Sequence, residues 1–189
     1  SGKVLSHLLK KHVADILPSY LNDEGRLVLG ICNGFQTITK MGLVPNLSGK
    51  LEPEASLINN IGGSFIDRWV QLRTNPANNS PWLSGINSMR VPIRHGEGRF
   101  IVRDAAIDSG IAEKKLPAFY YDGENPNGAH LAIAGVTDPS GRVLGMMPHP
   151  EAFVQADQDP AWRPGQGDGN PTAGMRLFLN AVHYCRECI

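Results

Sequence analysis

The stretch LVLGICNGFQTITKMG, residues 27–42, decides the fold class of this sequence. Residues 27–29 form a short apolar run that predicts a buried strand, and residues 35–41 predict a helix that ends at Gly42. Between the two lies the pattern G-x-C-x-G, with Cys32 at the apex of the expected strand-to-helix turn. This is the layout of a nucleophile elbow in which cysteine takes the place of serine.

The elbow pattern allows two interpretations of Cys32. Glycines at positions 30 and 34 let a strand and a helix pass closely, and the positive end of the following helix favours a thiolate over a thiol. Cys32 is therefore a candidate nucleophile. The alternative is a buried structural cysteine on a strand–helix turn, and the local pattern alone leaves both open.

Composition narrows the class of protein. A chain of 189 residues is long enough for one domain with a substantial core. The 18 basic and 18 acidic residues give a formal net charge of zero, so we expect no nucleic-acid partner and no anionic membrane surface. No apolar run approaches the roughly 18 residues of a membrane span. Three cysteines argue against a disulfide framework, so a cytoplasmic location is expected.

The rest of the chain predicts a mixed α/β architecture. Helical spacing over residues 3–17 predicts an amphipathic helix ended by Pro18. Strands are predicted at 64–73, in two pieces within 88–102, and at 117–121, 130–138 and 142–148. A final helix from about Pro171 is expected to bury Met175, Phe178, Leu179 and Val182. Because helices and strands interleave early and strands crowd the middle, we expect an α/β sheet with an antiparallel extension.

A nucleophilic thiolate needs a base, and the segment GMMPHPE, residues 145–151, offers one. His149 follows an apolar strand and Glu151 follows two residues later. In an extended segment these side chains share a face, so the carboxylate can accept one imidazole N–H and leave the other nitrogen for Cys32. A structural histidine is the alternative for His149 taken alone, but the combination with the elbow indicates a Cys–His–Glu catalytic set.

Several motifs give the sequence a family resemblance. GICNGFQ (30–36) and PHPE (148–151) resemble the nucleophile and His-x-Glu motifs of class I glutamine amidotransferases. DRWV (67–70), RHGEGRF (94–100), NPNG (125–128) and residues 134–151 narrow the resemblance to the glutaminase part of phosphoribosylformylglycinamidine synthase, over nearly the whole chain. The resemblance implies a flavodoxin-like three-layer α/β fold with an antiparallel extension, as one glutamine amidotransferase domain over residues 1–189.

The resemblance also implies roles for residues. Cys32 attacks the side-chain amide of L-glutamine, His149 moves the proton to the departing ammonia, and Glu151 orients the imidazole. Asn33 supplies an oxyanion donor through its backbone N–H, Gln36 contacts the substrate, and the backbone of residues 94–96 holds its α-amino and carboxylate groups. The substrate-binding set implied by the resemblance is Gly30, Asn33, Gln36, Arg94, His95 and Gly96, and no metal site is expected.

The implied partner is a synthetase domain or subunit. It converts formylglycinamide ribonucleotide to its amidine in purine biosynthesis, using ATP and magnesium, whereas this chain is expected to need no cofactor. Members of the family carry about two further strands and a glycine-bearing loop before the first helix, and that loop supplies a second oxyanion donor. We therefore expect a domain that is incomplete at its N-terminus, with an uncovered sheet edge. Such a domain should have little glutaminase activity on its own. We also expect the 155–171 loop to lie near the synthetase.

Two other functions stay open at this point. One is a stand-alone cysteine hydrolase of similar fold, although Gln36 and the RHGEGRF segment favour an amino-acid substrate. The other is a non-catalytic docking segment of a larger synthetase, although the intact Cys–His–Glu set argues against it. Cys185-x-x-Cys188 has no second ligand pair at a zinc-site spacing, so two helix-end thiols are the preferred interpretation.

Overall fold

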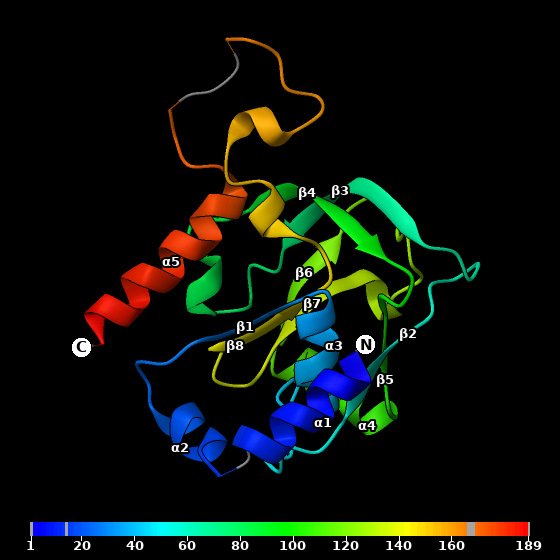
Figure 1. Ribbon diagram of the computed structural model, residues 1–189, viewed down its shortest axis with the longest axis vertical. Coiled ribbons are helices and arrows are strands. Elements are labelled where there is room, and N and C mark those ends of the chain that lie inside the picture. Colours follow the sequence, from blue (N-terminus) through cyan, green and yellow to red (C-terminus); the bar gives the residue numbers. More distant parts are fainter. Residues whose placement is uncertain (1, 14, 166–168, 189) are drawn as a thin grey trace.

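The structure is a computed structural model, and it describes residues 2–13, 15–165 and 169–188. A curled central sheet has six strands in the order β1-β8-β7-β6-β3-β4, and a second sheet pairs β2 with β5 (Figure 1). The strands are β1 (Val28–Ile31), β2 (Ala55–Ile58), β3 (Ile66–Thr74), β4 (Ser88–His95), β5 (Arg99–Val102), β6 (Pro117–Tyr121), β7 (Ile133–Thr137) and β8 (Val143–Met146). This mixed α/β architecture is the fold class that the sequence predicts.

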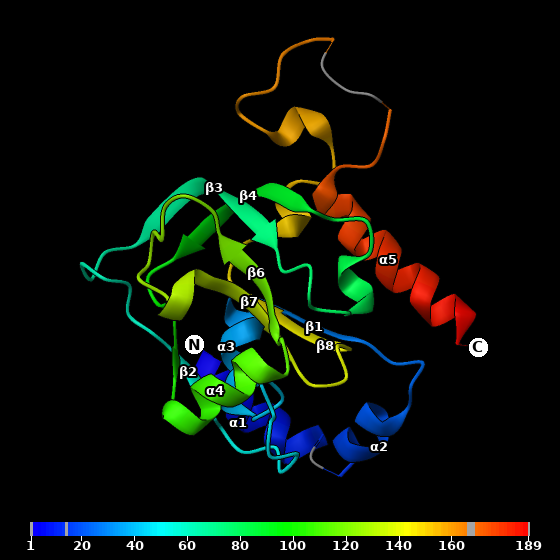
Figure 2. The same cartoon turned by 180° about the vertical axis from the view of Figure 1, so that it is seen from behind.

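Five α-helices and four short 3-10 helices accompany the sheets in the described residues. The α-helices are α1 (Gly2–Val13), α2 (Leu17–Asn22), α3 (Asn33–Lys40), α4 (Ala105–Glu113) and α5 (Ala173–Glu187). The 3-10 helices are η1 (Pro81–Leu83), η2 (His130–Ala132), η3 (Pro150–Ala152) and η4 (Ala156–Gln158). Figures 1 and 2 show α1, α3 and α4 grouped together, whereas α5 lies apart from them beside η1 and η3. None of the described helices is long and apolar enough to cross a membrane.

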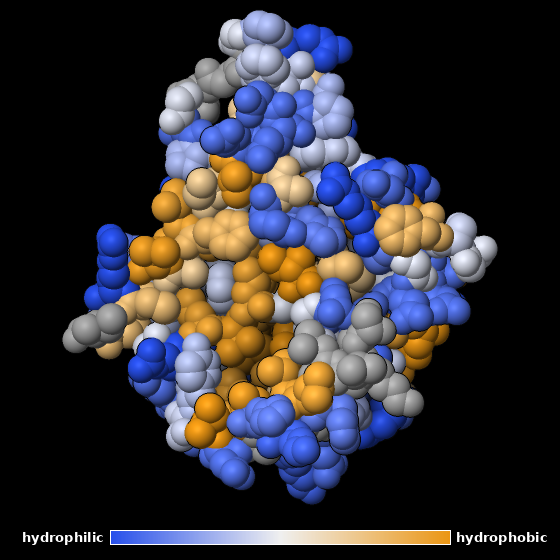
Figure 3. Space-filling model, in the orientation of Figure 1, coloured by the Kyte–Doolittle hydropathy of each residue, from blue (hydrophilic) through white to orange (hydrophobic). Residues whose placement is uncertain are grey.

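The strand that leads into the elbow has one strand neighbour. β1 pairs in parallel with β8, and Gly30 lies opposite Gly145. All other pairings are antiparallel. In the part of the chain that is described, no strand pairs with the other edge of β1. Apolar residues gather on the hollowed front face of the molecule, where β1 lies in Figure 1 (Figure 3).

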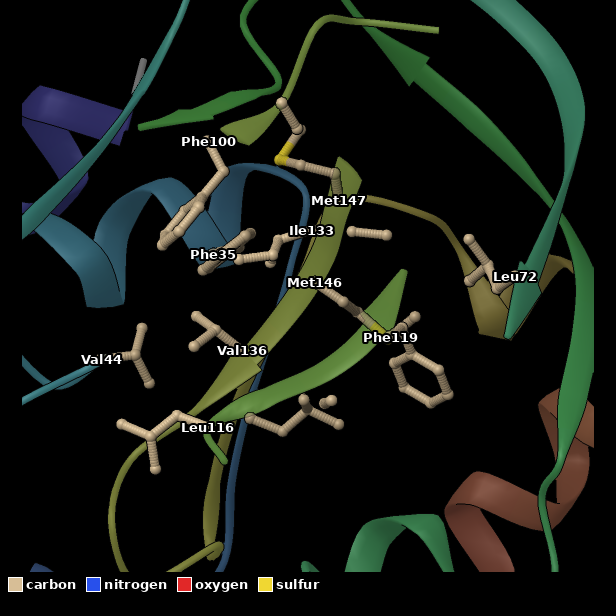
Figure 4. Close-up of a cluster of buried hydrophobic side chains, with 14 of the residues drawn as sticks. Phe35, Val44, Leu72, Phe100, Leu116, Phe119, Ile133, Val136, Met146 and Met147 are labelled. Atoms are coloured by element: carbon tan, nitrogen blue, oxygen red, sulfur yellow. The ribbon is translucent and has the colours of Figure 1, made fainter. Parts of the chain in front are cut away.

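The core joins the two sheets through the elbow helix. Phe35 of α3 stacks on Phe100 of β5, with ring centroids 5.9 Å apart and planes 15° apart, and both side chains are fully buried. Figure 4 shows them among Val44, Leu72, Leu116, Phe119, Ile133, Val136, Met146 and Met147. Burying one such side chain contributes about 1.5–3 kcal/mol. The core therefore holds α3, and with it the elbow, against the segment that precedes β5.

The first helical region differs from the prediction of one helix over 3–17. Helix α1 ends at Val13, and a second helix, α2, begins at Leu17 with Pro18 in its first turn. Proline has no N–H to donate, but the first turn of a helix needs none. Pro18 therefore begins a helix, and the prediction that it ends one is wrong.

The last helix begins where the sequence predicts, but its buried face is different. Thr172 caps α5 by accepting a hydrogen bond from the backbone N–H of Met175 at 3.1 Å. Gly174 and Leu177 are buried, whereas Leu179 and Val182 are 43% and 49% exposed. The prediction that Leu179 and Val182 are buried is therefore wrong, because α5 turns its Gly174–Leu177 side towards η1 and η3.

Two elements were not expected from the sequence, and the two strands within 88–102 pair with different partners. Helix α4 begins at an Asp104 cap, whose side chain accepts from the N–H of Ile107 at 2.9 Å, and β2 is only four residues long. Residues 88–102 do contain two strands, as predicted. However, β4 pairs with β3 and β5 pairs with β2, so the 95–98 segment connects two sheets instead of closing a hairpin.

Candidate active site

Cys32 lies at the junction of β1 and α3 in a conformation that few residues adopt. Its φ is 51° and its ψ is −105°, which is strained for a residue with a Cβ. Its N–H donates to the carbonyl of Met146 at 2.9 Å, and its carbonyl accepts from the N–H of Gln36 at 3.1 Å. Sheet and helix therefore hold the residue from both sides, as a nucleophile elbow requires.

The two glycines of the elbow have different roles. A Cβ on Gly30 would lie 2.7 Å from Cδ1 of Ile38 and 2.8 Å from the carbonyl carbon of Gly34, so this position needs glycine for α3 to approach β1. A Cβ on Gly34 would meet nothing within 4 Å, so the predicted steric role of Gly34 is wrong. Gly30 does not line the pocket beside Cys32, so its role is to admit the helix.

His149 and Glu151 form the pair that the sequence predicts. Nδ1 of His149 lies 2.5 Å from Oε1 of Glu151. The segment is not extended as expected, since residues 150–152 form η3 and His149 has ψ 85°. The N–H of His149 donates to the carbonyl of Pro92 at 2.9 Å. Helix α5 packs closely against η3, since a Cβ on Gly174 would lie 2.4 Å from the carbonyl oxygen of Pro150.

The surroundings of His149 favour its protonated form. Its interaction with the Cys32 side chain, followed by its hydrogen bond to Glu151, raises the pKa of His149 to about 9. Nε2 of His149 is buried and has no hydrogen-bond partner, although the ring lies close enough to Cys32 for the two to interact. Burial raises the pKa of Glu151, but the hydrogen bond and charge of His149, with the charge of Arg94, outweigh it and lower that pKa. An imidazolium between a carboxylate and the cysteine is therefore the state that this geometry stabilises.

A pocket of about 320 Å³ opens beside the cysteine. It is lined by Cys32, Asn33, Gln36, Arg94, His95, Gly96 and Glu97, which include every residue of the predicted substrate-binding set except Gly30. The carbonyl oxygen of Arg94 lies 3.7 Å from Sγ of Cys32, and Nε2 of Gln36 donates to the carbonyl of Glu97 at 2.6 Å. The start of α3 and the backbone of residues 94–97 thus form its two walls. A larger hollow of about 640 Å³ among residues 74–87 contains neither cysteine nor histidine.

One pocket wall depends on a residue that the sequence did not single out. The side chain of Asn60 donates to the carbonyls of His95 at 2.8 Å and Ser64 at 3.0 Å, and its Oδ1 accepts from the N–H of Gly98 at 3.1 Å. Because Oδ1 also lies 3.1 Å from Nδ1 of His95, that ring nitrogen is the donor. Burial, followed by the charge of His149, lowers the pKa of His95 to about 4, so its ring is neutral.

The other end of this wall rests on the NPNG segment. The side chain of Asn127 is fully buried, donates to the carbonyl of Gly98 at 2.8 Å and contacts the hydroxyl of Tyr121 at 3.2 Å. A Cβ on Gly98 would lie 2.1 Å from Cε1 of His95, so only glycine fits over that ring. Asn127 and Gly98 therefore shape the pocket without lining it.

The C-terminal thiols lie away from these groups. Cys185 is half-buried and Cys188 is exposed, and neither forms a disulfide. Among the described residues there is no group of three or more His, Cys, Asp or Glu side chains that could hold a metal ion.

The fold and the site together define a class of protein. An α/β sheet that carries a cysteine elbow, a His–Glu pair and a pocket walled by Gln36 and residues 94–97 is the arrangement of a class I glutamine amidotransferase. The family model described as a CobB/CobQ-like glutamine amidotransferase domain matches residues 1–185.

Curated relatives define the family more closely. The chain is 34% identical to the phosphoribosylformylglycinamidine synthase subunit PurQ of Dehalococcoides mccartyi, over 99% of this chain and 74% of that protein. It is also 34% identical to PurQ of Methanococcus maripaludis, over 97% of this chain and 74% of that protein. A solved structure titled "Structure of PurLQS from Thermotoga maritima" matches with a TM-score of 0.69 and 28% identity, over 95% of this chain and 71% of that one. The chain therefore belongs to the PurQ family of glutamine amidotransferases.

Proposed function

We propose that this protein is the glutaminase part of phosphoribosylformylglycinamidine synthase. It hydrolyses L-glutamine to glutamate and delivers the ammonia to a synthetase subunit, which converts formylglycinamide ribonucleotide to formylglycinamidine ribonucleotide. The observation that carries the proposal is the position of Cys32. The residue is strained at an elbow, lies close to the His149–Glu151 pair, and opens onto a pocket of about 320 Å³.

The first half of the reaction forms a thioester. The thiolate of Cys32 attacks the side-chain carbonyl carbon of glutamine, and the carbonyl oxygen gains the negative charge. The backbone N–H of Asn33, at the first position of α3, is placed at the helix N-terminus, where donors and dipole favour such a charge. The C–N bond then breaks, and the proton held on Nε2 of His149 passes to the departing nitrogen to release ammonia.

The second half consumes a water molecule. His149, now neutral, takes a proton from the water as its oxygen attacks the thioester carbonyl. The C–S bond breaks, glutamate leaves, and Cys32 and His149 return to the thiolate and imidazolium. Glu151 accepts the Nδ1–H bond throughout, and this bond fixes the ring so that Nε2 faces the reaction.

The substrate is recognised by one helix and one backbone segment. Gln36, held by the carbonyl of Glu97 at 2.6 Å, contacts the glutamine chain. The backbone of residues 94–96 holds the α-amino and α-carboxylate groups. Synthesis of the amidine consumes ATP with magnesium, and both bind to the synthetase subunit in this proposal.

A glutamine analogue with an electrophilic carbon tests the assignment of the nucleophile. We expect 6-diazo-5-oxo-norleucine to label Cys32 with complete loss of glutaminase activity, and to leave Cys185 and Cys188 unlabelled. Peptide mapping by mass spectrometry locates the adduct, and Cys32→Ser is the matched control that accepts no label. An adduct mainly on Cys185 or Cys188, with Cys32 free, would contradict the assignment.

A further inference from the structure

The loop between β2 and β3, residues 59–65, exposes large apolar side chains beside the active site. Ile61 is 60% exposed and Phe65 is 67% exposed. Both ribbon views show this loop projecting from the body, on the side away from α5 (Figures 1 and 2). The side chain of Leu131 in η2, three residues after Gly128, is also apolar and is 64% exposed. Large apolar side chains exposed on one short loop suit a surface that a partner covers.

The loop is a folded element. The N–H of Gly63 donates to the carbonyl of Asn60 at 3.0 Å, and the N–H of Ile61 donates to the carbonyl of Asn127 at 3.1 Å. The side chain of Ile61 covers Gly128, since a Cβ there would lie 2.1 Å from Cδ1 of Ile61. The loop therefore presents its apolar side chains from a fixed backbone, which lowers the entropy cost of binding.

The same loop holds one wall of the glutamine pocket. The N–H of Asn60 donates to the carbonyl of Gly96 at 2.9 Å, and its side chain bonds the carbonyl of His95 and the N–H of Gly98. The ring of Phe65 lies beside Gly96, since a Cβ added to Gly96 would be 3.9 Å from Cδ2 of Phe65. Direct hydrogen bonds thereby join the loop to the backbone that lines the pocket.

We propose that Ile61 and Phe65 are the docking surface for the synthetase subunit, and that Asn60 couples this contact to the glutamine pocket. The proposal rests on the proposed function, because that function requires a partner to receive ammonia next to the pocket. An aromatic and an aliphatic anchor, bordered by the exposed ion pairs Arg68–Glu124 and Arg94–Asp67, have the composition of a protein interface. When the synthetase covers the loop, the hydrogen bonds of Asn60 transmit this contact to residues 95–98 beside the glutamine pocket.

The docking surface is tested with charged substitutions in the loop. Ile61→Asp and Phe65→Asp should each weaken association with the synthetase subunit at least tenfold by calorimetric titration. Leu179→Asp on α5 is the matched control, because Leu179 is also an exposed apolar residue but lies on the other side of the molecule. It should bind as the unmodified protein does. Thermal unfolding of each variant confirms that it is folded.

The coupling is tested separately with Asn60→Ser. This variant keeps Ile61 and Phe65, so it should bind the synthetase subunit with at most a threefold change, but the subunit should no longer stimulate its glutaminase activity. Unchanged association of both aspartate variants would overturn the docking surface, and full stimulation of Asn60→Ser would overturn the coupling. Either result leaves the proposed function intact if the unmodified protein is labelled at Cys32. Failure of that labelling would instead overturn the proposed function.

Discussion

At the scale of the residue, the chemistry depends on the charge of one imidazole. His149 has Cys32 on one side and Glu151 on the other, and both raise its pKa, to about 9. A histidine with a raised pKa binds its proton more tightly in the folded protein than in the unfolded chain. The resulting stabilisation is complete below the ordinary pKa of about 6.5 and is lost as the pH rises through about 9. In the proposed mechanism, His149 is therefore protonated at neutral pH and begins the cycle as the acid that releases ammonia.

This charge state predicts the pH dependence of the enzyme. We expect kcat/KM for glutamine to fall as the pH rises through about 9, because deprotonated His149 cannot protonate the leaving nitrogen. Glu151→Gln removes the carboxylate charge that raises this pKa but leaves an amide oxygen to accept the Nδ1–H bond, so the falling limb should move to lower pH. An NMR titration of the His149 ring, alongside the pH–rate profile, measures both. A limb that stays at the same pH in Glu151→Gln would contradict the role given to Glu151.

The residues that we propose for catalysis could be predicted from the sequence because their signals are local. Cys32 lies within the G-x-C-x-G pattern of the elbow, and His149 and Glu151 are two residues apart at the end of a predicted strand. Asn60 could not be found in this way. Its role comes from bonds to residues 95–98, 35 and more positions later, and the sequence around it has no periodicity or motif that points there.

At the scale of the element, the elbow depends on how closely α3 packs on two strands. Gly30 of β1 and Gly145 of β8 are opposite each other, and a Cβ on Gly145 would lie 2.1 Å from Cδ2 of Phe35. Phe35 in turn stacks on Phe100 of β5. The strained conformation of Cys32 is held because the helix on one side and the sheet on the other are fixed by these contacts.

The two glycines of the elbow should respond oppositely to alanine. Gly30→Ala places a Cβ 2.7 Å from Ile38 and 2.8 Å from Gly34, so we expect a loss of about 1–3 kcal/mol in the free energy of unfolding. Gly34→Ala, in α3, meets nothing and should be neutral or stabilise by up to about 1 kcal/mol. Urea denaturation compares the two. Equal destabilisation by both substitutions would show that close packing at Gly30 is not what the elbow requires.

The elements themselves were predictable where their pattern was strong. The elbow strand and helix, and most strands of the central sheet, follow from apolar runs and turn residues. The buried face of α5 was not predictable, because Leu179 and Val182 fit an amphipathic stripe equally well and only the contacts of Gly174 and Leu177 with η3 and η1 select the other side. The end of α1 at Val13 and the start of α2 at Leu17 do not follow from the sequence, because Pro18 can end a helix or begin one.

The start of the 155–171 segment contacts the central sheet, whereas residues 166–168 lie outside the described residues. Asp159 pairs with Arg90 of β4, the guanidinium of Arg90 lies 5.2 Å from the Trp69 ring centroid, and Phe153 meets the same ring edge-on at 5.7 Å. Residues 153–159 are thereby fixed beside the turn that carries His149. The expectation that the 155–171 loop lies near the synthetase stays a prediction.

At the scale of the whole molecule, the glutamine pocket, the turn that carries His149 and Glu151, and the 59–65 loop lie next to one another. The neutral ring of His95 and the side chain of Asn60 connect the loop to the pocket, and Asn127 supports the same backbone from the other side. This arrangement suits a glutaminase whose product is used by another subunit. The proposed docking residues Ile61 and Phe65 lie beside the pocket, where such a subunit would receive the ammonia.

The most direct test of this account follows the nitrogen atom. The protein, its synthetase subunit, ATP, magnesium and formylglycinamide ribonucleotide are incubated with glutamine carrying ¹⁵N in its side-chain amide, and the amidine product is analysed by mass spectrometry. We expect ¹⁵N in the product with the unmodified protein and none with Cys32→Ala. With an ammonium salt as the nitrogen source, both proteins should support synthesis equally. Transfer of ¹⁵N from glutamine by Cys32→Ala at the unmodified rate would contradict the account.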